Sequence, residues 1–176
     1  MWLDPDSDPR QGGPSPVDER TTLLEYLRCY RLTLRMKCAD LDAGQLAARS
    51  VPPSNMSLLG LVRHMADVER HWFRRVLAGD DAPSRYRIPE DDNADFNGAS
   101  ADPEVVEDAW AAWREEVADA ERCIAGFEDL GTRVPLGGEG STIAVREVLV
   151  HMIEEYARHC GHADLLRERI DGRVGQ

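Results

Sequence analysis

Hydrophobic residues recur with the spacing of an α-helix in four segments of the chain, and no segment shows sustained strand alternation. The segments span about residues 18–42, 57–78, 103–126 and 142–170. Asp102 followed by proline is a typical start for the third helix. The inward positions expected in the second helix are Leu58, Leu61, Val62, Met65, Val68, Trp72 and Val76. The pattern therefore predicts an all-α protein.

Four helices of this length predict a four-helix bundle. The connections between the first and second helices, and between the third and fourth, are short enough for antiparallel neighbours. The connection over residues 79–102 is long for a simple turn and can run back along a whole helix. We therefore expect up-down-down-up connectivity, with a long crossover between helices 2 and 3. The bundle domain is expected over residues 17–176, after a flexible tail of residues 1–16 that is rich in Pro, Gly and Asp.

Length and charge narrow the classes of partner. A chain of 176 residues suits one domain. The net charge is −12, from 33 acidic and 21 basic residues, which argues against general binding to nucleic acid or to an anionic membrane. Apolar runs are far shorter than the roughly 20 residues of a membrane span, and residues 1–16 lack the pattern of a secretory signal. A cytoplasmic location is the expectation.

The segment "HMIEEYARHCGH", residues 151–162, concentrates histidines and glutamates on the fourth helix. At about 100° per residue, His159 falls near the centre of the apolar stripe of this helix. Glu155 lies one turn earlier and is adjacent to His159. Glu154 points away, while His151 and His162 lie at the boundary with solvent. The stripe is formed by Val145, Val148, Met152, Tyr156, Ala163 and Leu166.

A carboxylate and an imidazole at i, i+4 can bind one metal ion, with a third ligand from another helix. On the second helix, His64 and His71 both lie on the flank of the apolar stripe. His64 has more apolar neighbours, so it is the preferred third ligand. Such a site can lower the pKa of a bound thiol or activate water.

Structural interpretations compete with the metal site. His159 alone is typical of a hydrogen-bonded core histidine, and Glu155 could form a surface ion pair with Arg158 or Arg122. Residues 151–155 match neither zincin signature. The four cysteines include no C-x-x-C pair, which favours structural thiols.

The segments "SLLGLVRHMADVERHWFRRVLAGDD" and "STIAVREVLVHMIEEYARHCGHADLLRERIDG" resemble the actinobacterial branch of the DinB-like superfamily. That branch includes the mycothiol-dependent maleylpyruvate isomerases, and the superfamily includes bacillithiol transferases. The resemblance implies an up-down-down-up four-helix bundle. It also implies a metal site with one histidine from helix 2 and two ligands spaced i, i+4 on helix 4. By that match the ligands are His64, Glu155 and His159. Many members have histidine where Glu155 stands, whereas the isomerase is similar in having glutamate.

The same resemblance implies a divalent metal, zinc or nickel, and a low-molecular-weight thiol such as mycothiol. The expected function is S-transfer or isomerisation on small electrophiles. The isomerase has a further C-terminal domain, and this chain ends soon after its fourth helix, so maleylpyruvate isomerase activity itself is not expected. Two alternatives remain open: a non-catalytic metal-binding or stress-response bundle, and a metal-dependent hydrolase. The sequence leaves a homodimer open as well.

Overall fold

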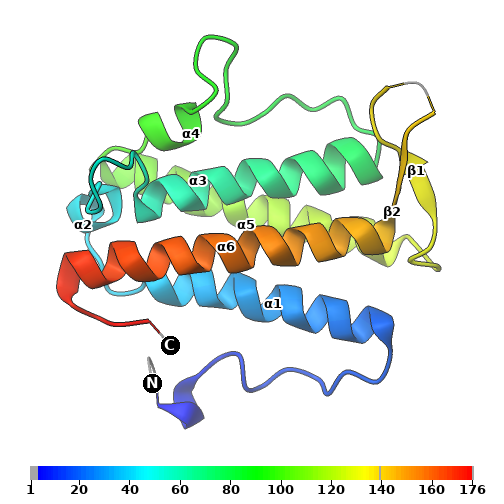
Figure 1. Ribbon diagram of the computed structural model, residues 1–176, viewed down its shortest axis with the longest axis horizontal. Helices are drawn as coiled ribbons and strands as arrows, with labels where there is room; N and C mark the ends of the chain where they lie inside the picture. The colour runs from blue at the N-terminus through cyan, green and yellow to red at the C-terminus, as the bar shows by residue number, and fades with distance from the viewer. Residues whose placement is uncertain (1–3, 139, 176) are drawn as a thin grey trace.

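The computed structural model describes residues 4–138 and 140–175, and these residues are mainly helical (Figure 1). The all-α prediction is confirmed as a predominantly helical protein, to which one short antiparallel strand pair is added. In chain order the elements are η1 (Pro5–Ser7), α1 (Glu19–Cys38), α2 (Ala43–Ala47), α3 (Leu58–Glu69), η2 (Arg70–Leu77), α4 (Ala94–Asn97), α5 (Pro103–Ala125), β1 (Arg133–Pro135), β2 (Thr142–Ala144) and α6 (Val145–Asp171).

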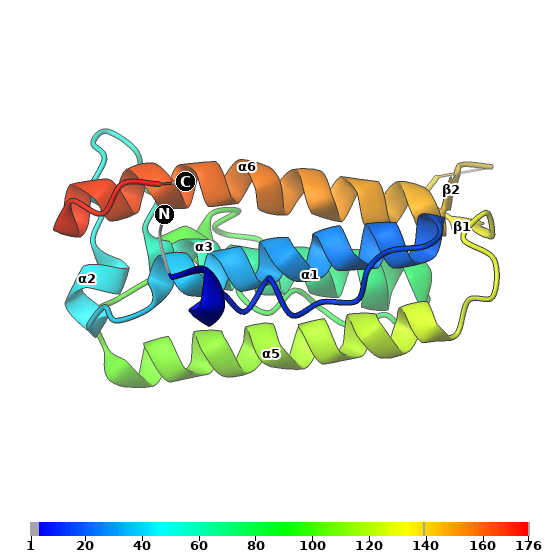
Figure 2. The same ribbon diagram turned by 90° about the horizontal axis from the view of Figure 1, so that it is seen from below.

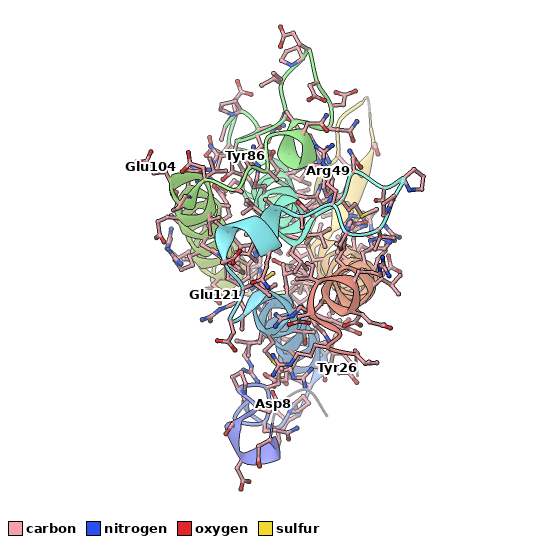
Figure 3. The ribbon with its side chains drawn as sticks, turned by 90° about the vertical axis from the view of Figure 1, so that its left-hand side faces the viewer. Asp8, Tyr26, Arg49, Tyr86, Glu104 and Glu121 are labelled. Carbon is pink, nitrogen blue, oxygen red and sulfur yellow. The ribbon has the colours of Figure 1, made fainter. Side chains whose placement is uncertain are left out.

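The long helical stretches lie side by side, with α1 packed along α6 and α3 packed along α5 (Figures 1 and 2). The colours of Figure 1 show α1 and α6 running in one direction and α3 and α5 running in the other. Seen end-on in Figure 3, these helices surround a common interior, and Asp8 lies outside α1. The N-terminal segment contacts α1 through Arg10, whose Nη1 donates to Thr33 Oγ1 at 3.2 Å.

The ends of the helices follow local capping chemistry, and two of them differ from the predicted bounds. The first predicted helix ends at Cys38 because Asp40 adopts a left-handed backbone conformation, with φ of 61°, which an α-helix cannot include. The fourth begins at Val145, later than predicted, because Thr142–Ala144 pair with Arg133–Pro135 as strands. It ends at Gly172, whose φ of 79° suits glycine.

The second predicted helix changes its winding at Arg70, where α3 continues as the π-helical segment η2. Its wider turns are shown by the bond from Ala78 N to Phe73 O, 3.0 Å, which joins residues five apart. The added residue per turn shifts the buried face, so Phe73 and Leu77 are buried. Trp72 and Val76, predicted to face inward by α-helical spacing, are only half-buried.

A buried network of four side chains joins the four long helical stretches. Arg31 of α1 donates to both carboxylate oxygens of Glu69 in α3, at 2.8 and 2.7 Å. Tyr156 of α6 donates its hydroxyl proton to Glu69 Oε1 at 2.7 Å, and Trp113 Nε1 of α5 donates to the Tyr156 oxygen at 2.9 Å. Burial, and then the negative charge of Glu69, raises the pKa of Tyr156 well above its ordinary value. We call these four residues the core network.

The connection between η2 and α5 runs back beside α3, so that α5 begins near the start of α3 (Figure 1). It is held to α3 by the Asp67 carboxylate, which accepts the backbone N–H groups of Arg85, Tyr86 and Arg87 at 2.5, 3.0 and 3.2 Å. In the part of the chain described, none of the helices combines the length and apolarity needed to cross a membrane.

Candidate metal centre

Helices α3 and α6 bring together the three residues that the sequence predicts as metal ligands. His64, Glu155 and His159 each offer one ligand atom, and these atoms all lie within 4.8 Å of one another. His64 and His159 are buried and Glu155 is half-buried, while Glu154 is exposed, as predicted. The rings of the two histidines are 4.7 Å apart between centroids. We call His64, Glu155 and His159 the triad.

The orientation of His64 is fixed by a residue from the long connection. Asp95, in α4, is 1% exposed, and its Oδ2 lies 2.8 Å from His64 Nδ1. Burial raises the pKa of Asp95, but the hydrogen bond and charge of His64 outweigh burial, so this pKa lies below its ordinary value. A carboxylate here keeps the proton on Nδ1 and leaves Nε2 with its lone pair. Phe96 stacks on the same ring, with centroids 5.2 Å apart.

His159 faces Glu155 on one side and His162 on the other. Its Nε2 lies 3.4 Å from Glu155 Oε2, and its Nδ1 lies 3.3 Å from His162 Nδ1. Burial, and then the charge of His64, lowers the pKa of His159 to about 4. The ring is therefore neutral at neutral pH, which is the form that binds a metal.

Glu155 also satisfies the competing interpretation of a surface ion pair. Its Oε1 accepts a hydrogen bond from Arg158 Nη1 at 2.7 Å, and Arg158 is exposed. Its other oxygen, Oε2, is the one that faces His159. The ion pair with Arg158 and a place in the triad are thus compatible, because they use different oxygens.

The chemistry of the triad fits a divalent cation. Two neutral imidazole nitrogens and one carboxylate oxygen form a ligand set used by zinc and by other divalent transition metals. A hydrogen-bonded carboxylate behind a ligating histidine, as Asp95 stands behind His64, is a regular companion of such sites. The described residues contain a second acidic group, Glu115, Glu116 and Asp119.

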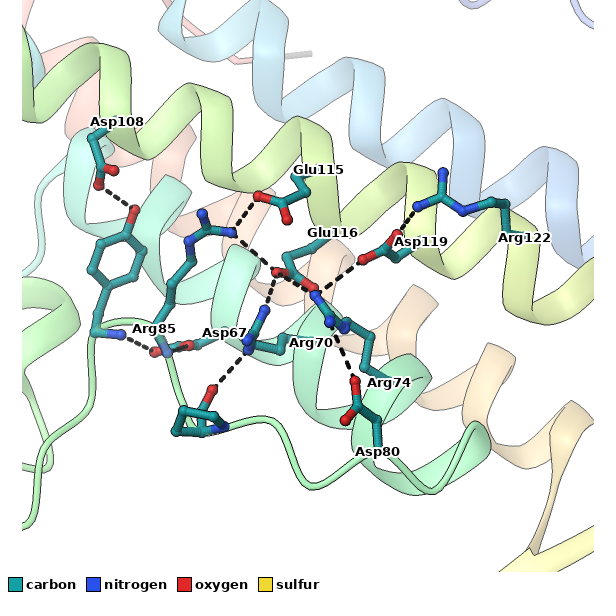
Figure 4. A network of polar contacts seen from close by, with 12 residues as sticks. Asp67, Arg70, Arg74, Asp80, Arg85, Asp108, Glu115, Glu116, Asp119 and Arg122 are labelled. Atoms are coloured by element: carbon teal, nitrogen blue, oxygen red, sulfur yellow. Dashed lines mark hydrogen bonds and ion pairs between the residues drawn. The ribbon is translucent and has the colours of Figure 1, made fainter.

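Arginines already occupy that second group (Figure 4). Glu116 is buried and accepts from Arg70 Nη1 at 2.5 Å, and Arg85 Nη1 donates to Glu115 at 2.7 Å. Arg74 Nη1 lies 3.1 Å from Asp119. Because the carboxylates are neutralised by side chains, the triad is the better candidate metal site.

The other histidines of the sequence analysis lie nearby. His71, the alternative third ligand, is exposed and is not among the atoms that converge. His151 is half-buried, as predicted, and its ring lies 4.6 Å from that of Trp72. His162 is also half-buried, but its contact with His159 was not predicted.

Asp95 and Phe96 are the residues of the site that sequence reasoning missed. They lie in the connection that was predicted to be irregular, among many other aspartates and asparagines. Nothing in local spacing distinguishes Asp95 from Asp91 or Asp92, because its contact with His64 depends on the path of the chain.

Fold and site together define a helical protein with a His/Glu/His cluster between two of its long helices. The family model for mycothiol S-transferases matches residues 22–172. The chain therefore belongs to the mycothiol S-transferase family, which agrees with the DinB-like resemblance of its sequence. A search of curated proteins found no match.

Proposed function

We propose that the protein is a metal-dependent mycothiol S-transferase that acts on small electrophiles. In this proposal His64, Glu155 and His159 hold a divalent cation, zinc or nickel. The observation that carries the proposal is the convergence of three ligand atoms within 4.8 Å, in a member of the mycothiol S-transferase family.

The proposal extends to the architecture. We infer that residues 17–176 form one up-down-down-up four-helix bundle, made of α1, α3 with η2, α5 and α6. The directions of these helices in Figure 1 support it. In this arrangement α3 and α6 are neighbours, which lets one ligand come from α3 and two from α6.

The residues in and around the triad have different roles in binding the cation. Asp95 holds the proton on His64 Nδ1, so that the lone pair of Nε2 is free to bind the cation. His159 is neutral at neutral pH and Glu155 supplies the negative charge. Phe96 packs against His64 and limits the access of water to that ring. When bound, a divalent cation lowers the pKa of a thiol and thus favours the thiolate at neutral pH.

The reaction is a substitution at carbon. The mycothiol sulfur forms a bond to the electrophilic carbon, and the leaving group departs with the electron pair of the bond that breaks. The thiol proton passes to solvent. The role of the protein is to hold both reactants beside the triad, since positioning alone contributes strongly to such reactions.

The first test uses two adjacent glutamates as a matched pair. Glu155→Ala removes a triad carboxylate, whereas Glu154→Ala removes an exposed one. We expect purified wild type and Glu154→Ala to bind one equivalent of zinc or nickel, and Glu155→Ala to bind about 100-fold more weakly, since one of three protein ligands is lost. Competition with a chromogenic chelator measures this. Equal affinity in the two variants would remove the triad from consideration.

The second test follows the loss of free mycothiol in the presence of a panel of alkyl and aryl halides. We expect conjugation by wild type, its loss after chelation, and its return when zinc or nickel is added. Metal binding without conjugation across the panel would contradict the transferase and favour a non-catalytic metal-binding bundle. Metal-dependent ester hydrolysis without thiol consumption would instead identify a hydrolase.

A further inference from the structure

A cleft of about 430 Å³ lies beside the triad, and its lining combines candidate metal ligands with positively charged side chains. Two triad residues, His64 and Glu155, line the cleft together with Trp72 and His151. Two arginines, Arg75 of η2 and Arg87 of the long connection, line it as well. Two guanidinium groups beside the candidate metal ligands indicate that a ligand of this cleft carries a negatively charged group.

The charges of the cleft contrast with those of the whole chain. The protein has a net charge of −12. In the cleft, the Asp67 carboxylate is engaged by three backbone N–H groups, and Glu155 is paired with Arg158. Neither carboxylate therefore neutralises Arg75. His71 is exposed on one side and lines the same cleft; loss of part of its hydration, and then the positive charges of Arg75 and Arg87, lowers its pKa.

Arg75 has fewer polar contacts with the protein than Arg87. Its side chain is exposed, and among the described residues it has neither a hydrogen bond nor an ion pair with a carboxylate. Its neighbour Arg74, by contrast, pairs with Asp80 and Asp119. Arg87 has one loose contact, 3.7 Å from its Nε to Asp95 Oδ2, and is 48% exposed. Both therefore retain donors for a ligand.

The segment that leads to Arg87 is tied to α5 and η2 by hydrogen bonds (Figure 4). Tyr86 donates its hydroxyl proton to Asp108 at 2.8 Å, and Arg85 donates to Glu115 at 2.7 Å. Arg70 Nε donates to the carbonyl of Pro83 at 2.7 Å. A segment fixed in this way loses little conformational entropy on binding.

We propose that the cleft binds an electrophile that carries a carboxylate, with Arg75 as the main partner of that carboxylate and Arg87 as the second. The proposal rests on the proposed function and names the substrate class of the same site. A guanidinium group pairs with a carboxylate through two parallel hydrogen bonds, which gives orientation as well as affinity. The carboxylate would thus hold the reacting carbon toward the triad.

Binding of non-reactive probes tests the anion site without depending on catalysis. Benzoate and benzamide differ only in charge and hydrogen-bonding groups, and titration followed by tryptophan fluorescence compares them on the metal-loaded protein. We expect wild type to bind benzoate about tenfold more tightly than benzamide, as a charge-assisted pair at an exposed site allows. Arg75→Gln should abolish most of this preference, and Arg87→Gln should reduce it.

The matched control is Arg169→Gln, which removes the same charge from an exposed position outside the cleft, in the last turn of α6. It should retain the wild-type preference. Equal binding of benzoate and benzamide by wild type would overturn the proposal. So would a preference that survives both cleft variants and is lost in His159→Ala, because the carboxylate would then be binding at the triad.

A reactive pair separates this proposal from the proposed function. para-Chloromethylbenzoate and para-chloromethylbenzamide both react with mycothiol by forming a carbon–sulfur bond, releasing chloride with its electron pair and the thiol proton to solvent. We expect kcat/KM for the benzoate to exceed that for the amide about tenfold in wild type, and most of this difference to be lost in Arg75→Gln. If neither is conjugated while benzoate binding still depends on Arg75, the transferase assignment fails and the anion site stands. Equal conjugation of both by wild type overturns the anion site and leaves the transferase.

Discussion

Two groups of polar side chains, the core network and the triad, both include residues of α3 and α6, and they differ in how their polar atoms are paired. In the core network, Glu69 of α3 meets Arg31 and Tyr156, so donors face acceptors and a positive charge offsets the negative one. In the triad, His64 lies five positions before Glu69, and His159 lies three positions after Tyr156. There the ligand atoms face one another, as atoms do that share a cation.

The partners on the far side of each ring strengthen the contrast. Asp95 and His162 engage the Nδ1 atoms of His64 and His159, which leaves the Nε2 atoms for a ligand. In the core network the side chains pair mainly with one another in the interior, and the outer contact of Arg31, with the exposed Glu121, is long at 4.0 Å. The same two helices thus carry a closed polar group that stabilises the fold and an open one that suits a ligand.

The largest effect should come from breaking the core network. Glu69 is fully buried, so Glu69→Ala leaves the buried charge of Arg31 with only a 4.0 Å contact to the exposed Glu121. We expect the free energy of unfolding to fall by about 3–5 kcal/mol in urea titrations with chelator present. Glu155→Ala in the same metal-free conditions should lose less than about 1 kcal/mol, because Glu155 is only half-buried. Equal losses would show that the triad is a second structural network.

The second effect tests the outer partner of the triad. Asp95→Asn keeps the shape of the side chain and removes the charge that orients His64. We expect zinc affinity to fall about 10–100-fold, the usual consequence of losing a carboxylate behind a ligating histidine. Asp92→Asn, at an exposed position of the same connection, is the control. Competition with a chromogenic chelator measures both, and equal affinities would show that Asp95 does not set the orientation of His64.

The two groups also differ in how far the sequence predicts them. Helical periodicity placed His159 near the centre of the apolar stripe, Glu155 beside it and His64 on the flank, because α3 and the middle of α6 follow regular α-helical spacing. The same spacing, extended from Met65, places Glu69 on the buried face. A glutamate on an apolar stripe was therefore a signal of the core network, although its partner Arg31 depends on how α1 packs.

Regular spacing fails where the winding or the path of the chain changes. The π-helical winding that starts at Arg70 moves Phe73 inward in place of Trp72. The hydrophobic pattern of the sequence does not indicate the additional residue per turn. Asp95 reaches His64 only because the connection folds back beside α3 and is anchored by Asp67. Such contacts between residues far apart in sequence are set by tertiary packing.

A third effect tests the core network without removing a charge. Tyr156→Phe removes the hydroxyl that donates to Glu69 and accepts from Trp113, leaving a buried indole N–H without that acceptor. We expect a loss of about 1–2 kcal/mol in the free energy of unfolding, with metal affinity unchanged. Tyr26→Phe is the control, since Tyr26 is 56% exposed. A change in metal affinity in Tyr156→Phe would mean that the two groups are coupled through α6.

The smallest effect concerns the outer partner of His159. His162 is half-buried, and its Nδ1 lies within hydrogen-bond distance of His159 Nδ1, at 3.3 Å. His162→Phe keeps a ring in place and removes this bond between neutral groups, which is weaker than the bond from Asp95 to His64. We therefore expect zinc affinity to fall only about two- to tenfold, measured by the same chelator competition. His71→Phe, at an exposed histidine of the cleft, should leave the affinity unchanged. A loss in His162→Phe as large as that in Glu155→Ala would instead make His162 a ligand, and the open group would then have four members.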